Sequence, residues 1–242
     1  MAKKKKRAKS AKKKFAELED KQRNVEWYTE RLGHATGSGR ISSYIANLGN
    51  PHELNRMLDA MADELTWSTE QIKLAFETEQ ANANEYMRWG SAHELEAART
   101  YQMLRNSNII YSPGFREHPE FPCFGVSLDF IDTTENWVGE IKCPGKEGNH
   151  AKTIRYGMGN WHVDQTQLQL ECCPEQDLLI FVSYDPRHPI EKERLYTLIQ
   201  LRNEDWIARF RSKAGEFNEH LKAGTRFKHA IVQTAEGVPQ LF

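Results

Sequence analysis

The chain has 242 residues, of which 39% are hydrophobic and 28% are charged, and its formal net charge at pH 7 is −1. These values fit one hydrophobic core and exclude a repeat array, a fully disordered protein or a membrane protein, because no apolar run is long enough to cross a bilayer. The first positive charges are not followed by a secretory segment and four cysteines are too few for a disulfide framework, so we expect a cytoplasmic protein with reduced thiols.

The positive charge is concentrated at the N-terminus. Residues 3–14 contain nine lysines and arginines and no acid, and without these nine charges residues 15–242 carry −10. Because mutually repelling lysines do not fold alone, we expect residues 1–14 to be a basic disordered tail and residues 15–242 to be a single domain. The tail is either solvated or a salt-sensitive contact for nucleic acid.

Residues 15–48 have the apolar spacing of two helices that break near Gly33. The sequence Thr-Gly-Ser-Gly at residues 36–39 precedes the second helix, so small hydroxyl side chains lie where unpaired N–H groups point outward. This pattern is typical of an ordinary helix cap, and it also suits a bound anion. Residues 50–83 are polar and helical in character, which predicts a helical insertion.

A stronger helical pattern covers residues 84–106. Its apolar stripe consists of Met87, Leu95, Ala98, Tyr101 and Leu104. The spacing of the stripe predicts that this face packs against the core. Glu94 lies at the edge of the stripe, from which its side chain can project into a cleft.

After Pro113 the pattern changes to short runs rich in β-branched and aromatic residues, which predict strands. The expected strands are residues 121–131, 137–143, 178–184 and 195–201. The turn residues at 132–136 make the first two strands a hairpin. With further helices expected at 160–172 and 203–221, the order predicts an α/β fold whose mixed central sheet is flanked by helices and preceded by N-terminal helices.

The hairpin carries charged residues that can perform hydrolysis. Asp129 and Glu140 lie on its two strands and can face each other, while Lys142 shares a face with Glu140 because strand side chains alternate. Two carboxylates can hold Mg²⁺, and an ammonium group can orient water or neutralise charge during phosphodiester hydrolysis. The simpler alternative is a surface hairpin with ordinary charges.

These residues and their surroundings resemble the lambda exonuclease type of viral recombination nuclease, within the PD-(D/E)XK superfamily. The resemblance covers about residues 25–215 and implies a restriction-endonuclease-like core. Its motifs are Arg31-Leu32-Gly33, Thr36-Gly37-Ser38, Met87-Arg88-Trp89-Gly90 with Glu94, Ala98-Arg99-Thr100, Ser127-x-Asp129, Glu140-x-Lys142-Cys143-Pro144, Gln165-x-Gln167 and Tyr184-Asp185-Pro186-Arg187.

The resemblance implies a role for each site residue. Asp129 and Glu140 would bind the metal, with the backbone carbonyl of Ile141 as a further ligand. Lys142 would position the attacking water, and Glu94 would reach the metal directly or through water. The family's pocket for a 5′-terminal phosphate corresponds to Arg31, Ser38, Ser127 and Gln165. An arginine fork with hydroxyl and amide donors is chemically suited to phosphate.

The function implied by the resemblance is an Mg²⁺-dependent 5′→3′ exonuclease. It would degrade linear double-stranded DNA from 5′-phosphorylated ends and leave 3′ single-stranded overhangs for recombination. We expect two Mg²⁺ ions per active site, with Mn²⁺ able to substitute. The resemblance also implies a homotrimer that encircles DNA, a single-strand annealing protein as partner, and a phage-encoded protein in a bacterial host. Two alternatives are a related PD-(D/E)XK endonuclease and a non-catalytic DNA-binding module.

Overall fold

A computed structural model describes residues 17–18, 22–176, 178–228, 231–233 and 239–241. The predicted basic tail at residues 1–14 lies outside the described residues, so the division into tail and domain stays a prediction. Within the described ranges, no helix is long and apolar enough to cross a membrane. The four cysteines are buried and form no disulfide.

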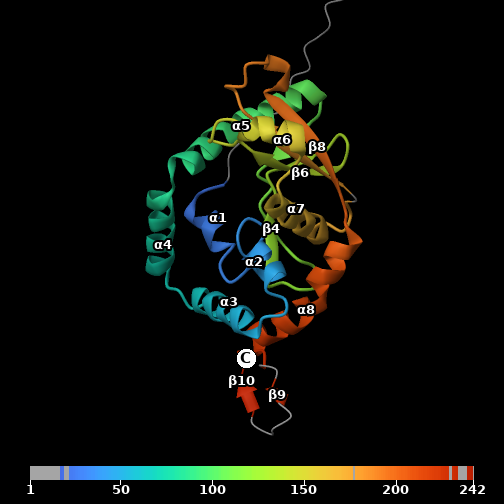
Figure 1. The fold of residues 1–242 in the computed structure, drawn as a ribbon. Helices are drawn as coiled ribbons and strands as arrows, with labels where there is room; N and C mark the ends of the chain where they lie inside the picture. The colour runs from blue at the N-terminus through green and yellow to red at the C-terminus, as the bar shows by residue number, and fades with distance from the viewer. Residues whose placement is uncertain (1–16, 19–21, 177, 229–230, 234–238, 242) are drawn as a thin grey trace, which may run out of the picture.

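A five-stranded mixed sheet forms the centre of the molecule, in the order β2-β5-β6-β7-β8 (Figure 1). Its strands are β2 (Ile109–Tyr111), β5 (Phe130–Asp132), β6 (Trp137–Lys142), β7 (Leu178–Tyr184) and β8 (Leu195–Leu201). β6 and β7 are parallel, and the other neighbours are antiparallel. The mixed α/β architecture and the β5–β6 hairpin were both predicted, and both are confirmed.

The remaining strands form two smaller sheets. A three-stranded sheet has the order β1-β4-β3, and β9 pairs with β10 in a hairpin that follows the last helix. Their strands are β1 (Ala35–Thr36), β3 (Phe115–Glu117), β4 (Phe124–Ser127), β9 (Ile231–Gln233) and β10 (Pro239–Leu241).

Helices cover both faces of the central sheet. The helices are α1 (Val25–Thr29), α2 (Arg40–Ala46), α3 (Pro51–Glu64), α4 (Thr69–Asn82), α5 (Glu85–Arg105), α6 (Asn149–Tyr156), α7 (Asn160–Cys172), the 3₁₀ turn η1 (Glu191–Glu193) and α8 (Glu204–Ala223). α5 packs with Ile180 and Val182 of β7, whereas α7 packs with the alternate residues Leu179 and Phe181. This alternation along one strand is why β7 is apolar on both faces.

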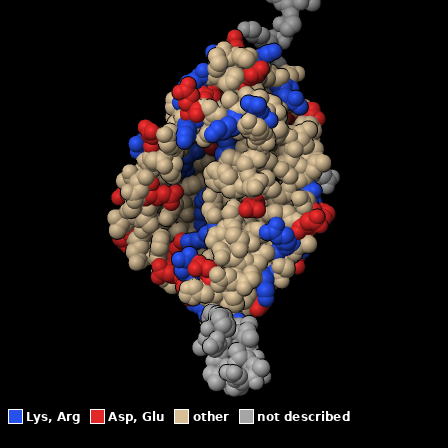
Figure 2. All heavy atoms as spheres, in the orientation of Figure 1, with Lys and Arg blue, Asp and Glu red and all other residues tan. Residues whose placement is uncertain are grey.

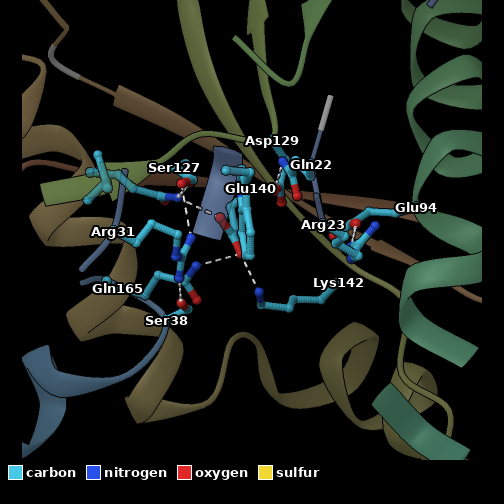
Figure 3. Close-up of a pocket in the computed structure, with 14 residues that line it drawn as sticks. Gln22, Arg23, Arg31, Ser38, Glu94, Ser127, Asp129, Glu140, Lys142 and Gln165 are labelled. Carbon is cyan, nitrogen blue, oxygen red and sulfur yellow. Dashed lines mark hydrogen bonds and ion pairs between the residues drawn. The ribbon is translucent and has the colours of Figure 1, made fainter. Parts of the chain in front are cut away.

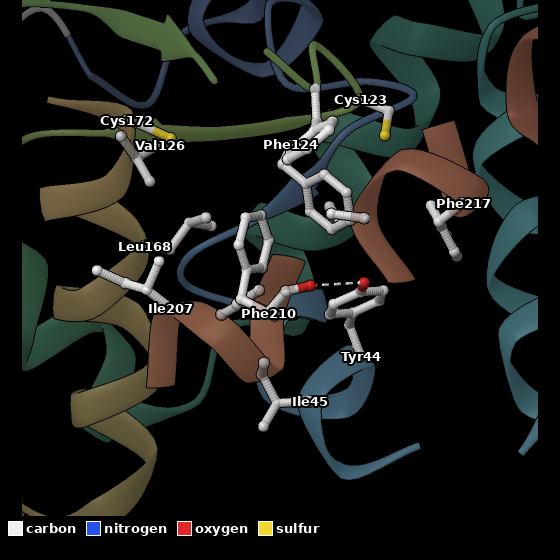
Figure 4. Close-up of a cluster of buried hydrophobic side chains, with 14 of the residues drawn as sticks. Tyr44, Ile45, Cys123, Phe124, Val126, Leu168, Cys172, Ile207, Phe210 and Phe217 are labelled. Atoms are coloured by element: carbon white, nitrogen blue, oxygen red, sulfur yellow. Dashed lines mark hydrogen bonds between the residues drawn. The ribbon is translucent and has the colours of Figure 1, made fainter. Parts of the chain in front are cut away.

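The larger core joins α2, α3, α7 and α8 to the sheet (Figure 4). Tyr44 and Phe210 are fully buried, and the Tyr44 hydroxyl donates to the Phe210 carbonyl at 3.0 Å. The rings of Phe124 and Phe217 surround Tyr44 at edge-on angles, with centroids 4.9 and 5.5 Å away. These geometries are favourable for aromatic pairs, so the cluster fixes the N-terminal helices against the C-terminal helix.

The predicted helical insertion at residues 50–83 consists of α3 and α4. Pro51 is the first residue of α3, which buries Leu54, Leu58 and Met61 in the larger core. α4 has no buried residue, and Figure 1 shows it at one side of the molecule, away from the sheet. α3 is therefore a part of the core, and only α4 stands outside it.

Three expectations were wrong in part. The expected strand 121–131 is interrupted at Leu128 and Asp129, because β4 pairs with β1 and β3 instead of continuing into the central sheet. The apolar stripe of α5 fails at its ends: Met87 is 51% and Leu104 67% exposed, since they lie beyond the part of α5 that packs on the sheet. The first helix expected within residues 15–48 is shorter than predicted, since α1 has only five residues.

We predict that Phe210→Ala lowers the free energy of unfolding by about 3–5 kcal/mol, because a fully buried ring is lost and a cavity remains. Urea unfolding followed by circular dichroism measures this change. Leu104→Ala is the matched control, since Leu104 is exposed and its truncation should change stability by less than about 0.5 kcal/mol. Equal effects of the two changes would contradict the assignment of the core.

Candidate active site

The hairpin register brings Asp129 and Glu140 together. Phe130 pairs with Gly139, so Asp129 immediately before β5 lies beside Glu140 and Ile141 of β6. The Ile141 N–H donates to Asp129 Oδ2 at 2.6 Å. Both acids are buried, with 7% and 1% of their surfaces exposed. Asp129 therefore lies immediately before the short strand β5, and not within one continuous strand over residues 121–131 as the sequence predicted.

Three side chains donate to Glu140. Lys142 Nζ and Gln165 Nε2 both donate to Glu140 Oε1, and the distance from Gln165 Nε2 is 2.7 Å. Gln169 Nε2 donates to Glu140 Oε2 at 2.5 Å. Figure 3 shows the lysine and Gln165 converging on this carboxylate from β6 and α7. Lys142 is on the same face as Glu140, as strand alternation predicted. Glu140 is thus held in one orientation from both of its oxygens.

The three glutamines of α7 are buried, which the pattern of the sequence did not predict. In sequence, Gln165, Gln167 and Gln169 are typical of a polar helix face, yet each is at most 7% exposed. Gln167 exchanges hydrogen bonds with the Leu201 carbonyl and the Asn203 N–H. Gln169, which the sequence left without a role, binds Glu140, and its Oε1 has no hydrogen-bond partner among the described residues.

Two further residues beside the acids come from the segment before α1. Arg23 forms an ion pair with Glu94, and Gln22 Nε2 donates to Asp129 Oδ1 at 3.4 Å (Figure 3). Arg23 has a φ of +60°, a conformation that side-chain-bearing residues adopt rarely. Sequence reasoning missed both, because contacts across 71 and 107 residues leave no local pattern.

Burial and crowding shift the ionisation of the site. Burial raises the pKa of Asp129 well above its usual range, and the neighbouring Glu140 and Glu94 raise it further. Burial also raises the pKa of Glu94, although the Arg23 guanidinium opposes this effect. For Lys142, burial lowers the pKa, but the charges of Glu140 and Asp129 outweigh it and leave the pKa raised. Asp129 and Glu140 are therefore two buried acids that repel each other, and Lys142 only partly offsets this repulsion.

The donor set fits a hard divalent cation. Among the described residues, no three His, Cys, Asp or Glu side chains converge as a metal-binding group. Mg²⁺, however, is commonly held by one or two carboxylates together with substrate phosphate and water. Asp129 and Glu140 supply two such carboxylates in one cavity, and their mutual repulsion is the condition that a cation relieves.

Arg31 forms the second part of the same cavity. Its guanidinium donates to Ser127 Oγ at 2.9 Å and to Ser38 Oγ at 2.6 Å, and it lies 4.2 Å above the ring of Trp27. The cavity has a volume of about 160 Å³ and is lined by Arg31, both serines, the two hairpin acids, Glu94, Lys142 and Gln165. Arg31, Ser38, Ser127 and Gln165 thus line one cavity, and the Gln165 amide also donates to Glu140. Their role as a pocket for a 5′-terminal phosphate stays a prediction.

The Ser38 hydroxyl does not cap α2. The N-cap residue of α2 is Gly39, which makes no side-chain cap hydrogen bond, while Ser38 faces Arg31. The ordinary-cap interpretation of this segment is therefore wrong for Ser38.

A family model described as YqaJ-like viral recombinase domain matches residues 26–172, more than half of the chain. No curated protein matches the sequence. The fold is similar to that of the alkaline exonuclease LHK-Exo from Laribacter hongkongensis, with a TM-score of 0.65 and 24% identity over 83% of this chain and 94% of that protein. LHK-Exo in complex with dAMP matches with a TM-score of 0.64 and 25% identity over the same shares.

These similarities agree with the site geometry. The matched residues 26–172 include Arg31, Glu94, Asp129, Glu140 and Lys142. The family model confirms the predicted relation to the lambda exonuclease type of viral recombination nuclease. The similarity to LHK-Exo confirms the predicted α/β core with a mixed sheet flanked by helices. The chain belongs to the YqaJ-like viral recombinase domain family.

Proposed function

We propose that this protein is an Mg²⁺-dependent 5′→3′ exonuclease that degrades linear double-stranded DNA from 5′-phosphorylated ends and leaves 3′ single-stranded overhangs. The observation that carries the proposal is one cavity that contains both a carboxylate pair and an arginine fork. The first is suited to hydrolysis of a phosphodiester and the second to binding a terminal phosphate. LHK-Exo, the similar solved structure, is named as an alkaline exonuclease, which supports the same reaction class.

The side chains divide the work between binding and hydrolysis. Asp129 and Glu140 would hold Mg²⁺, which polarises a phosphoryl oxygen and lowers the pKa of a bound water. Lys142, held by Glu140, places a positive charge where negative charge develops on the phosphate. The proposal includes a second ion, which Glu94 would bind directly or through water. It also includes the backbone carbonyl of Ile141 as a metal ligand.

The polarity of digestion follows from the phosphate pocket. If Arg31 grips the 5′-terminal phosphate, the first phosphodiester is presented to the acids in the same cavity. Hydrolysis then leaves a new 5′-phosphate that can occupy the pocket again. Ser38 and Ser127 keep the guanidinium in place, and its stacking on Trp27 limits its rotation. An endonuclease would not need this pocket, so closed circular DNA should remain intact.

The proposal extends to assembly and partners. We infer a homotrimer that encircles DNA, with a single-strand annealing protein that receives the overhang. A ring would retain a body of net charge −10 on DNA by topology, where electrostatic attraction is weak. Sedimentation of the full chain as a monomer at micromolar concentration would contradict this arrangement.

Asp129→Asn should stabilise the metal-free protein. The raised pKa of Asp129 means that the fold favours its protonated form, so stability is lost as pH rises from the ordinary value of about 4 through the raised pKa. In EDTA at pH 8, the melting temperature of the variant should be roughly 2–8 °C above that of the wild type, which corresponds to a gain of about 1–2 kcal/mol in the free energy of unfolding. This difference should close toward pH 4. Thermal unfolding measures both.

The control is Glu135→Gln in the exposed hairpin turn, which should not change the melting temperature. Added Mg²⁺ should raise the melting temperature of the wild type and not that of Asp129→Asn, because ligands stabilise only the state that binds them. Equal Mg²⁺ responses in the two proteins would refute Asp129 as a ligand.

Arg31→Ala should remove the preference for phosphorylated ends. Loss of hydrogen bonds to a charged phosphate should lower kcat/KM on 5′-phosphorylated duplex by roughly 10- to 100-fold, and leave the slower reaction on 5′-hydroxyl ends nearly unchanged. Duplexes labelled at either end measure rate and polarity. Glu140→Gln is the inactive reference. Equal wild-type rates on both kinds of end, or digestion from the 3′ end, would reject the pocket assignment.

A further inference from the structure

A second and larger cavity, of about 860 Å³, adjoins the catalytic one. Five residues line both cavities: Arg23, Ser38, Glu94, Lys142 and Gln165. Arg31 does not line the larger cavity, which extends along the start of α5, the loop after β6, α6 and the start of α7. The proposed reaction gives this volume no role. A cavity of this size is comparable with those that hold drug-sized ligands.

Aromatic side chains on the rim of this cavity are exposed to water. Tyr156 is 72%, Trp161 64% and Tyr86 48% exposed, and all three line it. Single exposed aromatic residues are common, but several around one cavity mark a binding surface. α6 ends at Tyr156 and its C-cap is Gly157, whose φ is +84°, so the chain turns sharply between Tyr156 and Trp161. The two rings therefore flank a turn at the cavity mouth.

The Trp161 ring is supported from within the protein. It packs on His162 with centroids 4.2 Å apart and planes at 32°, and His162 packs in turn on the buried Phe181 at 5.3 Å. The ring also lies against Gly159, where an added Cβ would come within 3.4 Å of it. A ring held on one side and mostly exposed is suited to stacking with a planar group.

Positive charges accompany the aromatic rings. Lys146 and Lys152 line the cavity, and the Arg155 guanidinium lies 5.2 Å from the Tyr156 ring. Among the described residues that line the cavity, Glu94 is the only acid, and it belongs to the catalytic centre. In Figure 2, lysine and arginine side chains gather around the upper end of the hollow beside the α4 side of this face. Cations combined with exposed rings are the chemistry of single-strand nucleic-acid binding.

We propose that this cavity, the aromatic–lysine groove defined by Trp161, Tyr156, Lys146 and Lys152, binds unpaired nucleotides of the strand being hydrolysed. Their bases stack on the two rings and their phosphates contact the two lysines. The proposal rests on the proposed nuclease function and adds a binding site to it. Unpaired bases are required, because bases within a duplex are stacked on each other and expose no face to a protein ring. The groove joins the catalytic cavity at Lys142, which makes one path for the strand.

The test measures binding separately from hydrolysis. Full-length protein carrying Glu140→Gln is titrated with a fluorescent 5′-phosphorylated oligothymidine, and with the same backbone carrying abasic sites. Adding Trp161→Ala should weaken binding of oligothymidine roughly 5- to 100-fold, the effect of losing one stacked base, and should not change binding of the abasic strand. Trp161→Phe should restore most of the affinity. Lys152→Ala should weaken both strands and reduce the dependence of binding on salt.

Leu104→Ala is the control, since this residue is exposed at the far end of α5 and does not line the groove. The groove proposal would be overturned if Trp161→Ala, added to Glu140→Gln, left oligothymidine binding unchanged. This holds even if the wild type digests duplex DNA. An unchanged affinity is the result expected if the exposed rings form a surface for docking another protein. If Trp161→Ala weakens oligothymidine binding but the wild type does not digest labelled duplex, the exonuclease proposal is rejected and the groove proposal is retained. Loss of binding to the abasic strand as well would overturn stacking.

Discussion

The pairing of β5 with β6 is the constraint on which the active site depends. Because Phe130 is opposite Gly139 and the Ile141 N–H binds Asp129, two acids from different strands must share one buried space. Glycine is required at position 139, where a Cβ would overlap the Phe130 ring. The energetic result is repulsion between like charges in a medium of low polarity. The fold thus stores an unfavourable charge arrangement at the place where the proposed chemistry needs one.

The rest of the molecule fixes this charge cluster from several directions. α7 presents two amides to Glu140, α5 presents Glu94, and the segment around α1 supplies Arg31. These elements are held by different cores, since α5 packs on one face of the sheet and α7 on the other. The site therefore lies where both layers meet the end of the central strands. Polar groups buried at such a junction need complete hydrogen bonding, and Gln169 shows where it is incomplete among the described residues.

The sequence predicted the hairpin, the helices and the Asp129–Glu140–Lys142 constellation, because period-two alternation and turn residues act over short distances. It did not predict the interruption of the strand at Asp129, since a run of β-branched and aromatic residues looks the same in one sheet or two. The burial of the α7 glutamines was not predicted for a related reason. In sequence they look like a solvated helix face, and only tertiary contacts reveal that they are buried. The contacts of Gln22 and Arg23 are set by long-range packing alone. The roles assigned to the site residues through the family resemblance stay predictions.

The place where the N-terminal segment joins the body has a further consequence. Leu18 is packed in the core beside α5, and Gln22 lies against Asp129, so the chain that follows the lysine-rich residues 3–14 in sequence enters the fold close to Asp129. A short tether converts a weak attraction for a polyanion into a high effective concentration near its attachment point. If those lysines contact nucleic acid, the attraction would thus act near Asp129, and it would fade as counterions are added.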